Sequence, residues 1–435
     1  MQKDKYFLKL FEEQKAITGE EKVEPPSEEP FVQVRWGGRR PPLTKEDILK
    51  MNNVDLVKYL KEFKTEDSWE GPTEEGLAEV LRSAVKENPN KFVEELHLFI
   101  DVKYKYIYNI LYGLEDAWKE KKSFSWGKLF DFIKKYMTKE NFLEEGKKEQ
   151  GKDWYPYHII NVVADLIQEG TRSDSWAFSE NYFKQTEEII NILLDILEKL
   201  PKKEEITHRD FVTEALNTSY GRVIIAIILF SLRKARVEDK KGIKKEIKWE
   251  STQYDNLLSK GIIEAFTLFG EYMPNFAYLN KPWVEQKIKE FESFSSDNIK
   301  WQAFMEGYLY GYRVYQDLYK LMRNHYIKAI ESNFGKERTE NRLIQHITIG
   351  YLRGNESLEG KESLFKKIID KWNYTQLNEI VDFLWNQSCY VTEQGKETEE
   401  DKKIKDRIIK FWAWTYEKRD IIRPVSYTHL TLPTN

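Results

Sequence analysis

Four residues near the N-terminus have the types and spacing to bind a charged or aromatic partner. The stretch RWGGRR places Arg35, Arg39 and Arg40 around Trp36. Arginine beside an aromatic ring can hold a phosphate or stack on a base, and both residue types are common at protein interfaces. These four residues are therefore the candidate partner-binding residues. The simpler interpretation, which we favour, is a solvated linker whose Trp36 packs on the first helix pair.

The chain contains no pattern typical of catalysis or of metal binding. Its Gly-Lys pairs, such as those in WGKLF and FGKER, do not fit a phosphate-binding loop, and a G-x-S-x-G motif is absent. Cys389 is the single cysteine, and we expect it to be a small buried side chain. EELH supplies Glu94 and His97 only once, whereas a helical-bundle metal site needs a second copy. We predict no catalytic, cofactor-binding or metal-binding residue, and no enzyme activity within this chain.

A second basic stretch, KKGIKKEIK at 240–248, holds five lysines. Asp239, Glu246 and Glu250 offset three of these charges, so we expect a solvated loop. The alternative is that this loop, together with the N-terminal arginines, contacts nucleic acid.

The stretch 307–326, GYLYGYRVYQDLYKLMRNHY, has the most regular aromatic spacing in the chain. Its aromatic and methionine side chains recur in alternating steps of four and three residues, at Tyr308, Tyr312, Tyr315, Tyr319, Met322 and Tyr326. Such spacing places them on one face of a single helix, and Gly307 and Gly311 would let a neighbouring helix approach. We expect a buried helix seam, with an aromatic ligand site as the alternative, and a strong loss of stability on Tyr315→Asp.

Composition indicates a large helical scaffold with balanced charge. Of the 435 residues 33% are charged and 14% are aromatic, and the net charge is −4 with both signs interspersed. This balance gives no general attraction to nucleic acid or to an anionic membrane. The longest apolar run, VIIAIILF at 223–230, is far shorter than the roughly twenty residues that span a bilayer. We expect a protein of the reducing cytoplasm that does not enter the membrane.

Helical periodicity and capping signals continue almost without interruption from Leu43 onward. Thr44 and Asp47 have the spacing of a capping box, and Pro201 stops a long helix. We predict an all-α fold, an irregular α-solenoid or array of antiparallel helix pairs of the TPR or HEAT kind, with at most a short strand near 31–36. Toward the C-terminus we expect helices over the following ranges: 251–270, 282–292, 298–331, 337–353, 361–371, 375–390 and 401–421.

Changes in composition suggest four segments. Residues 1–42 are expected to form a helix and a linker rich in proline and glutamate. Residues 43–203 and 204–423 are expected to form the two halves of the helical array. Residues 424–435 lack any Lys, Arg, Asp or Glu, and VSYTHLTLPT resembles a translated sequencing adaptor. We expect the last segment to be an artefact, and the natural protein to continue beyond about Arg423.

Several phrases between about Leu43 and Ile330 resemble helical regions of large bacterial antiviral STAND-type NTPases and related P-loop defence proteins. They include LTKEDILKMNNVDLVKYLKEF, SWEGPTEEGLAEVLRSAVKENPNKF, NTSYGRVIIAIILFSLRKAR and FGEYMPNFAYLNKPWVEQKIKEF, together with WQAFMEGYLYGYRVYQDLYKLMRNHYIKAI. The resemblance implies a target-sensing C-terminal region, in which a helical array recognises a viral component and an ATPase elsewhere oligomerises. It carries no catalytic residue onto this chain.

The sequence therefore predicts a non-catalytic recognition segment that binds another protein, either a viral component or its own NTPase domain. The alternative is a helical scaffold that binds nucleic acid through its basic loops. A third class, a helical-bundle enzyme, lacks the paired carboxylates that it needs.

Overall fold

The computed structural model is all-α, as the sequence predicts. It describes residues 9–10, 12–13, 15–16, 40–65, 71–144, 155–201, 210–311, 313–332, 336–371, 378–386 and 398–417. Within these ranges there is no strand, and the only β-type pairing is an isolated bridge between Arg40 and Pro72. The stretch 31–36, Cys389 and the tail 424–435 lie outside the described residues.

The chain divides into two compact units. Met1–Pro42 and Lys64–Leu77 form one, and Leu43–Phe63 and Ala78–Asn435 form the other. In the described part of the first unit, the Thr73 amide donates to the Arg40 carbonyl over 2.8 Å. The second unit contains nearly all of the helical array.

The first half of the array contains both short and long helices. They are α2 (Lys45–Lys50), α3 (Asn53–Glu62), α4 (Glu74–Glu87), α5 (Pro89–Val93), η1 (Leu96–Asp101), α6 (Tyr104–Lys119), α7 (Trp126–Met137), α9 (Tyr155–Arg172), η2 (Glu180–Tyr182) and α10 (Phe183–Lys199).

The second half follows the same plan. Its helices are α11 (Phe211–Asn217), α12 (Ser219–Lys240), α13 (Thr252–Ser259), α14 (Ile263–Glu271), α15 (Met273–Phe291), α16 (Ile299–Tyr310), α17 (Gln316–Leu321), α18 (Arg323–Glu331), α19 (Glu337–Leu352), α20 (Leu364–Lys371) and α22 (Glu399–Glu417). Residues 378–386 are also helical.

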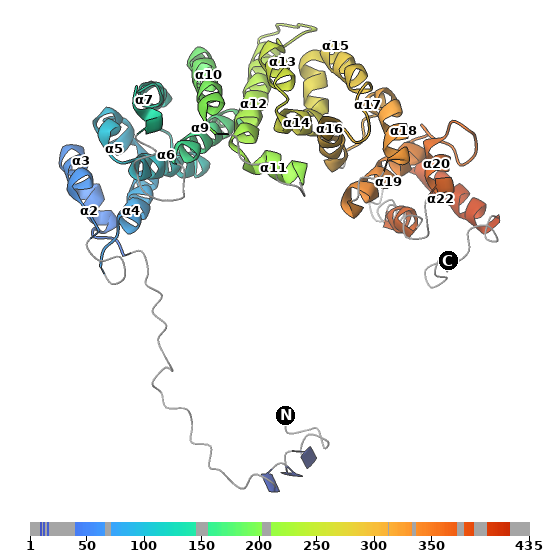
Figure 1. Ribbon diagram of the computed structural model, residues 1–435, viewed down its shortest axis with the longest axis horizontal. Coiled ribbons are helices and arrows are strands. Elements are labelled where there is room, and N and C mark those ends of the chain that lie inside the picture. The colour runs from blue at the N-terminus through green and yellow to red at the C-terminus, as the bar shows by residue number, and fades with distance from the viewer. Residues whose placement is uncertain are drawn as a thin grey trace. The chain divides into compact units, whose positions relative to one another are not determined.

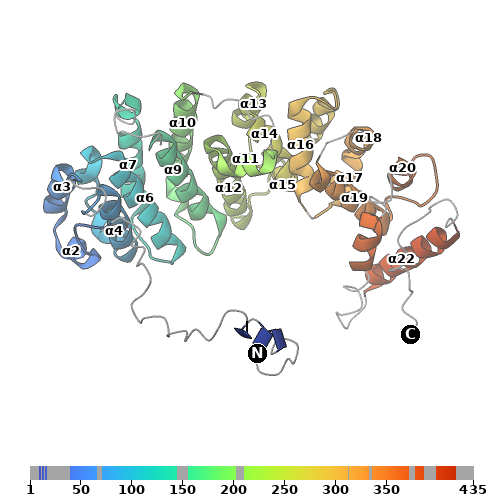
Figure 2. The same ribbon diagram turned by 60° about the horizontal axis from the view of Figure 1, so that its bottom comes forward.

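Helices of the second unit pack on neighbours that are close in chain order. α6 contacts α9, α9 contacts α12, and on the other side of this row α7 contacts α10 (Figures 1 and 2). α12 also contacts α10 and α14, so it joins the row α6–α9–α12 to the row α7–α10 and to the helices that follow. Its apolar segment from Val223 to Ile228 is buried throughout and forms part of the core.

No single described helix is both long enough and apolar enough to cross a bilayer. The pair α11 and α12 meets that criterion only when the two are taken together, across a bend of 79°.

The structure confirms the helix ends that the sequence predicts from capping residues and prolines. The Thr44 hydroxyl accepts from the Asp47 amide over 3.2 Å, and the Asp47 carboxylate accepts from the Thr44 amide over 3.0 Å, which completes a capping box. Pro89 occupies the first turn of α5, and α10 ends at Lys199, two residues before Pro201.

Side chains from later helices also close the C-terminal ends of earlier ones. The Lys91 ammonium donates to the carbonyls of Ile48, Leu49 and Met51 over 2.5, 2.8 and 2.6 Å, at the end of α2. Lys328 does the same for α15, because it donates to the carbonyls of Glu292 and Phe294. These bonds satisfy carbonyls that have no partner inside their own helix.

Two of the predicted helix ranges are wrong in the middle of the array. The range 251–270 is two helices, because α13 ends at Ser259 and Gly261 has a φ of +71° before α14 begins. The range 282–292 is only the second half of α15, which bends at Asn280 (φ −159°, ψ 82°) before Pro282. Asn280 caps this second half, since its side-chain oxygen accepts from the Trp283 amide over 3.1 Å.

The predicted single helix 298–331 is also wrong. α16 ends at Tyr310, Gly311 is extended (φ −72°, ψ 137°), and α17 and α18 follow as separate helices. Contacts from α19 favour the break, since His346 donates to the Gly311 carbonyl over 2.7 Å and Arg353 donates to the Val314 carbonyl. Tyr315 is 43% exposed at the start of α17, so the strong destabilisation predicted for Tyr315→Asp loses its basis. Tyr312 lies outside the described residues.

Three of the tyrosines in this stretch, Tyr308, Tyr319 and Tyr326, are nevertheless buried, as predicted, and two of them join a polar chain. Tyr308 and Tyr326 are 3.1 Å apart through their hydroxyls, and the Tyr326 hydroxyl is 3.2 Å from Nδ1 of His346. Since the Gly311 carbonyl can only accept, Nε2 of His346 carries the proton, and Nδ1 accepts from Tyr326. The chain therefore requires a neutral imidazole. Tyr319 belongs to the same buried cluster, with its ring centroid 4.9 Å from that of Tyr326.

Acidification should destabilise this part of the fold through His346. Burial lowers the pKa of His346 to about 4, below its ordinary value of 6.5. As the pH falls, His346 is therefore protonated in the unfolded chain at a higher pH than in the folded protein. The free energy of unfolding should fall by about 1.4 kcal/mol per pH unit between pH 6.5 and 4. Urea unfolding of the wild type and of His346→Gln across this range measures the effect as the difference between the two pH profiles. His97→Gln, at an exposed site, should keep the wild-type slope; equal slopes for all three proteins would contradict the prediction.

Candidate functional site

Of the four N-terminal residues that the sequence suggested as a binding site, the structure describes only Arg40. Arg35, Trp36 and Arg39 lie outside the described residues. Arg40 is exposed, and its carbonyl accepts from Thr73. The single EELH stretch is on the surface, where Glu94 pairs with Lys128 rather than with His97.

The lysines at 240–248 are largely compensated by nearby carboxylates. Their ion pairs are Lys240 with Asp174 (2.9 Å), Lys241 with Glu180 (2.7 Å), Lys245 with Glu238 (2.9 Å) and Lys248 with Asp239 (2.7 Å). Because neighbouring acids take up these charges, the stretch presents little free positive charge to a nucleic acid.

Asp174 holds several of the basic groups at this end of α12. Arg233, Arg236 and Lys240 all donate to its carboxylate, over 2.7, 2.9 and 2.9 Å. Burial alone would raise the pKa of Asp174, but the hydrogen bonds from Lys240 and the two arginines bring it well below its usual range. Arg236 also donates to the Thr171 carbonyl over 3.0 Å. The cluster joins α12 to the end of α9 and is best explained as a structural contact.

A more extended set of charges crosses α4, α6, α9 and α12. We call it the ladder surface and define it by four ion pairs and two tyrosines. Its members are Arg82 with Asp116, Lys119 with Glu115, Arg172 with Glu169, Arg222 with Asp165, Tyr108 and Tyr112.

Arginine and tyrosine meet at the α4 end of the ladder surface. The Arg82 guanidinium lies 3.4 Å from the ring centroid of Tyr112 and donates from Nε to Asp116 over 2.7 Å. Tyr108 continues the aromatic strip, 5.6 Å from Tyr112 and 5.4 Å from His158 between ring centroids. These side chains are half-buried, so their ring and guanidinium surfaces are partly accessible and already held in place.

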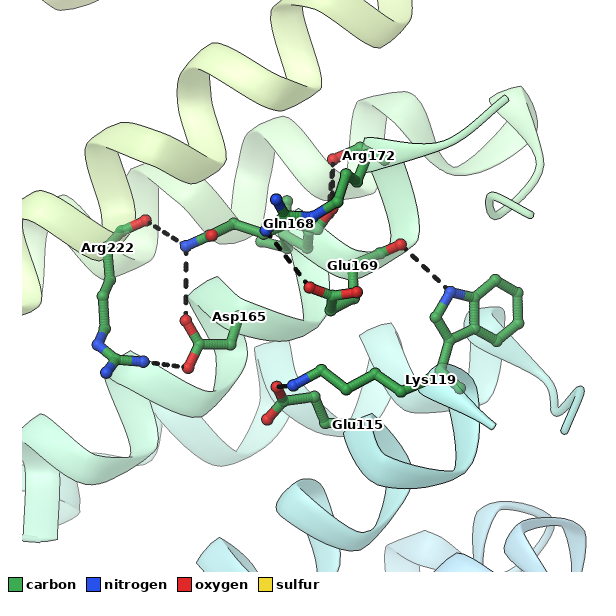
Figure 3. A network of polar contacts seen from close by, with 10 residues as sticks. Glu115, Lys119, Asp165, Gln168, Glu169, Arg172 and Arg222 are labelled. Atoms are coloured by element: carbon green, nitrogen blue, oxygen red, sulfur yellow. Dashed lines mark hydrogen bonds and ion pairs between the residues drawn. The ribbon is translucent and has the colours of Figure 1, made fainter. Parts of the chain in front are cut away.

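The middle of the ladder surface lies between α6 and α9. Figure 3 shows Glu115 and Lys119 of α6 beneath Asp165, Gln168 and Glu169 of α9. Lys119 pairs with Glu115 one helical turn away, and the Trp118 indole donates to the Glu169 carbonyl over 3.3 Å. The ion pair and the indole bond therefore hold charged groups at fixed places where the two helices meet.

The other end of the ladder surface joins α9 to α12 (Figure 3). Arg222 pairs with Asp165, and the Gln168 amide donates to the Arg222 carbonyl over 3.0 Å. Gln168 lies 3.5 Å from Asp165 as well. One arginine is thus bound through both its side chain and its backbone, which fixes the direction of the guanidinium.

Burial disfavours the charged form of two carboxylates of the ladder surface. Burial raises the pKa of Glu115, which is only 3% exposed, and Lys119 opposes this rise. Burial also raises the pKa of Asp165, and Arg222 opposes it. A carboxylate that is only partly compensated gains from an additional cation or hydrogen-bond donor. Glu115 is too buried to meet a partner, but the Asp165 side chain is 22% exposed and can receive such a group.

The ladder surface was not predicted from the sequence, because the helical periodicity marks the apolar faces of these helices and not their polar faces. The available signals were the i,i+4 spacing of Tyr108 and Tyr112, and of Glu115 and Lys119, on the polar side of α6. The pairing of Arg82 with Asp116 joins residues 34 positions apart, and that of Arg222 with Asp165 joins residues 57 apart. Neither pairing can be read from local spacing.

Comparisons with known proteins do not assign the chain to a family. No family model, no curated protein and no solved structure matches it. Within the described residues, no group of three or more His, Cys, Asp or Glu side chains is arranged to hold a metal ion.

Proposed function

We propose that the chain is a non-catalytic recognition scaffold of the cytoplasm that binds a protein partner through the ladder surface. The observation that carries the proposal is the Arg82–Tyr112 stack beside a row of ion pairs that are partly exposed, apart from the buried Glu115 carboxylate. Tyrosine and arginine supply much of the energy at protein interfaces, and groups that are held before binding lose less entropy when a partner docks.

The distribution of charge favours a protein partner over nucleic acid. Each cation of the ladder surface already has a carboxylate within the same surface, and most lysines at 240–248 are paired. Binding to a phosphate backbone relies on many uncompensated cations and the counterions that they release. A protein with charges of both signs can instead form ion pairs with both the cations and the carboxylates of such a surface.

The resemblance to antiviral NTPases supplies the wider setting of the proposal. On that basis the partner is a viral protein or an NTPase domain of the same system, and the array acts as the target-sensing part. Sequencing the genomic region upstream of the codon for Met1 tests this setting, because the proposal expects a P-loop ATPase there. An unrelated reading frame upstream would contradict the viral target. It would not affect the proposal that the ladder surface binds a protein.

Replacing Tyr112 should weaken the partner complex about tenfold or more, since interface tyrosines commonly contribute more than about 1.4 kcal/mol. The immobilised chain is used to capture proteins from phage-infected cells, and the captured protein is purified for affinity measurements. Tyr112→Ala is compared with Tyr278→Ala, which alters an exposed tyrosine that lies 4.1 Å from the Lys248 ammonium. The proposal expects a large loss of affinity for Tyr112→Ala alone.

The same two variants discriminate the alternative function. If basic loops bind nucleic acid, a labelled oligonucleotide should bind the wild type, with affinity falling steeply between about 50 and 200 mM salt. Tyr278→Ala should then weaken binding more than Tyr112→Ala does. That pattern, or a protein complex indifferent to Tyr112→Ala, would overturn the proposed role of the ladder surface.

A further inference from the structure

An open cleft of about 560 Å³ lies beside α13 and α15, away from the residues of the ladder surface. Phe266, Phe291 and Phe294 line it together with Trp283, and Asp255 and Lys300 supply charges. A volume of this size is within the range of sites for small organic molecules. The chemistry of the lining restricts which molecule fits.

The apolar part of the cleft is aromatic. The ring centroids of Phe266 and Phe291 are 5.3 Å apart, and those of Phe291 and Phe294 are also 5.3 Å apart in a stacked arrangement. Phe266 and Phe291 are buried, whereas Phe294 is half-buried at the end of the row. The accessible aromatic surface is therefore mainly that of Phe294, which favours a flat apolar ligand that can stack on its ring or meet its edge.

The acidic side chains of the cleft already have donors. Asp255 accepts from the Ser251 hydroxyl over 2.7 Å and from the Trp283 indole over 3.1 Å, and it pairs with Lys287 over 2.9 Å. Lys287 also pairs with Glu290 over 2.9 Å. With one lysine shared between two carboxylates, this part of the cleft carries a net negative charge and repels an anion.

Lys300 supplies the opposite charge near the phenylalanine row. Its ammonium lies 5.7 Å from the ring centroid of Phe266, and within the described residues it has no carboxylate partner at ion-pair distance. The side chain is half-buried, so its charge is partly removed from water. An anion placed beside it would gain a charge-assisted hydrogen bond that no group of the described chain supplies.

We propose that this cleft binds a small aromatic carboxylate, with its ring against Phe294 at the end of the phenylalanine row and its carboxylate on Lys300. The negative charge around Asp255 and Glu290 sets the orientation, because it disfavours the reversed pose. The site does not depend on the ladder surface, and a ligand here would act in addition to the proposed protein partner.

The proposal is tested with a fluorescent aromatic anion and an uncharged relative. Anilinonaphthalene sulfonate should bind the full chain saturably with one site. Naphthoate should displace it, and naphthamide, which has the same ring without the charge, should displace it at least about tenfold less well. Lys300→Gln should weaken naphthoate by about the same factor and make the two competitors equal, whereas Lys300→Arg should retain the preference.

Lys289→Gln is the matched control, because Lys289 is exposed on α15 and does not line the cleft. It should bind as the wild type does. Circular dichroism shows whether each variant keeps its helix content, so that loss of binding is not confused with unfolding. Equal displacement by naphthoate and naphthamide in the wild type, unsaturable dye binding, or an unchanged preference in Lys300→Gln would overturn the proposal.

Discussion

Gly307→Val is expected to cost more than about 4 kcal/mol and to unfold the region where α14 and α16 cross. A Cβ atom on Gly307 would lie 1.9 Å from the Thr267 carbonyl oxygen. On the facing helix, a Cβ on Gly270 would lie 2.2 Å from the Phe304 carbonyl oxygen. The two backbones touch at both glycines, so neither helix can move aside without losing the contact. Urea unfolding followed by circular dichroism measures the loss.

Gly311→Ala is the matched control for this prediction. Nothing lies within 4 Å of a Cβ built on Gly311, and its backbone has a negative φ that alanine readily adopts. Its unfolding free energy should therefore change by no more than about 1 kcal/mol. A Gly307→Val protein as stable as Gly311→Ala would mean that α14 and α16 do not cross so closely.

Glu356→Ala is expected to cost about 3–5 kcal/mol, because it removes a buried carboxylate that pairs with the partly exposed Arg323 and accepts two further hydrogen bonds. The Glu356 side chain is 1% exposed and accepts from three elements of the fold. Its donors are the Tyr319 hydroxyl (3.0 Å), the Arg323 guanidinium (2.9 Å) and the Leu364 amide (2.7 Å). Truncation leaves a tyrosine hydroxyl and an amide without their acceptor in the core, together with an uncompensated charge on Arg323.

Local measurement suits this prediction, because an array of helices can open in segments. Hydrogen exchange should become faster in α17, α18 and α20, the helices around Glu356, and remain unchanged in α6 and α9. Glu362→Ala is the control, since Glu362 is exposed and only its backbone carbonyl meets Arg323. If amide exchange in α17, α18 and α20 is equally slow in both variants, the Glu356 carboxylate does not hold these helices together.

The sequence predicts those parts of the fold that depend on near neighbours. Thr44 and Asp47 are three residues apart, so their capping box can be predicted from the sequence. Pro201 ends α10 through its own covalent structure, which is also a local property. The close approach at Gly307 was also anticipated. The break at Gly311 was not, because His346 and Arg353, which bind the residues of the break, come 35 and 39 positions later in the chain. Regular tyrosine spacing persists across the break and therefore predicted a continuous helix.

The candidate site was harder to predict than the fold for a related reason. A packed helix buries an apolar stripe that repeats every three or four residues, and this repeat survives in the sequence. The ladder surface instead depends on which polar faces meet after packing. Arg82 and Asp116 are neighbours only because α4 and α6 lie together. Balanced composition concealed the surface further, since its charges cancel.

The lysine that closes α2 has a mechanical consequence. Lys91 belongs to α5, yet it holds the C-terminal end of α2, with α3 and α4 between them in the chain. A pulling force applied at the N-terminal side cannot peel α2 away alone, because the ammonium must first release three carbonyls. Lys328 ties the end of α15 to α18 in the same manner, across α16 and α17. Under tension the array should therefore lengthen in steps of several helices, with step sizes set by how far each lysine reaches back along the chain.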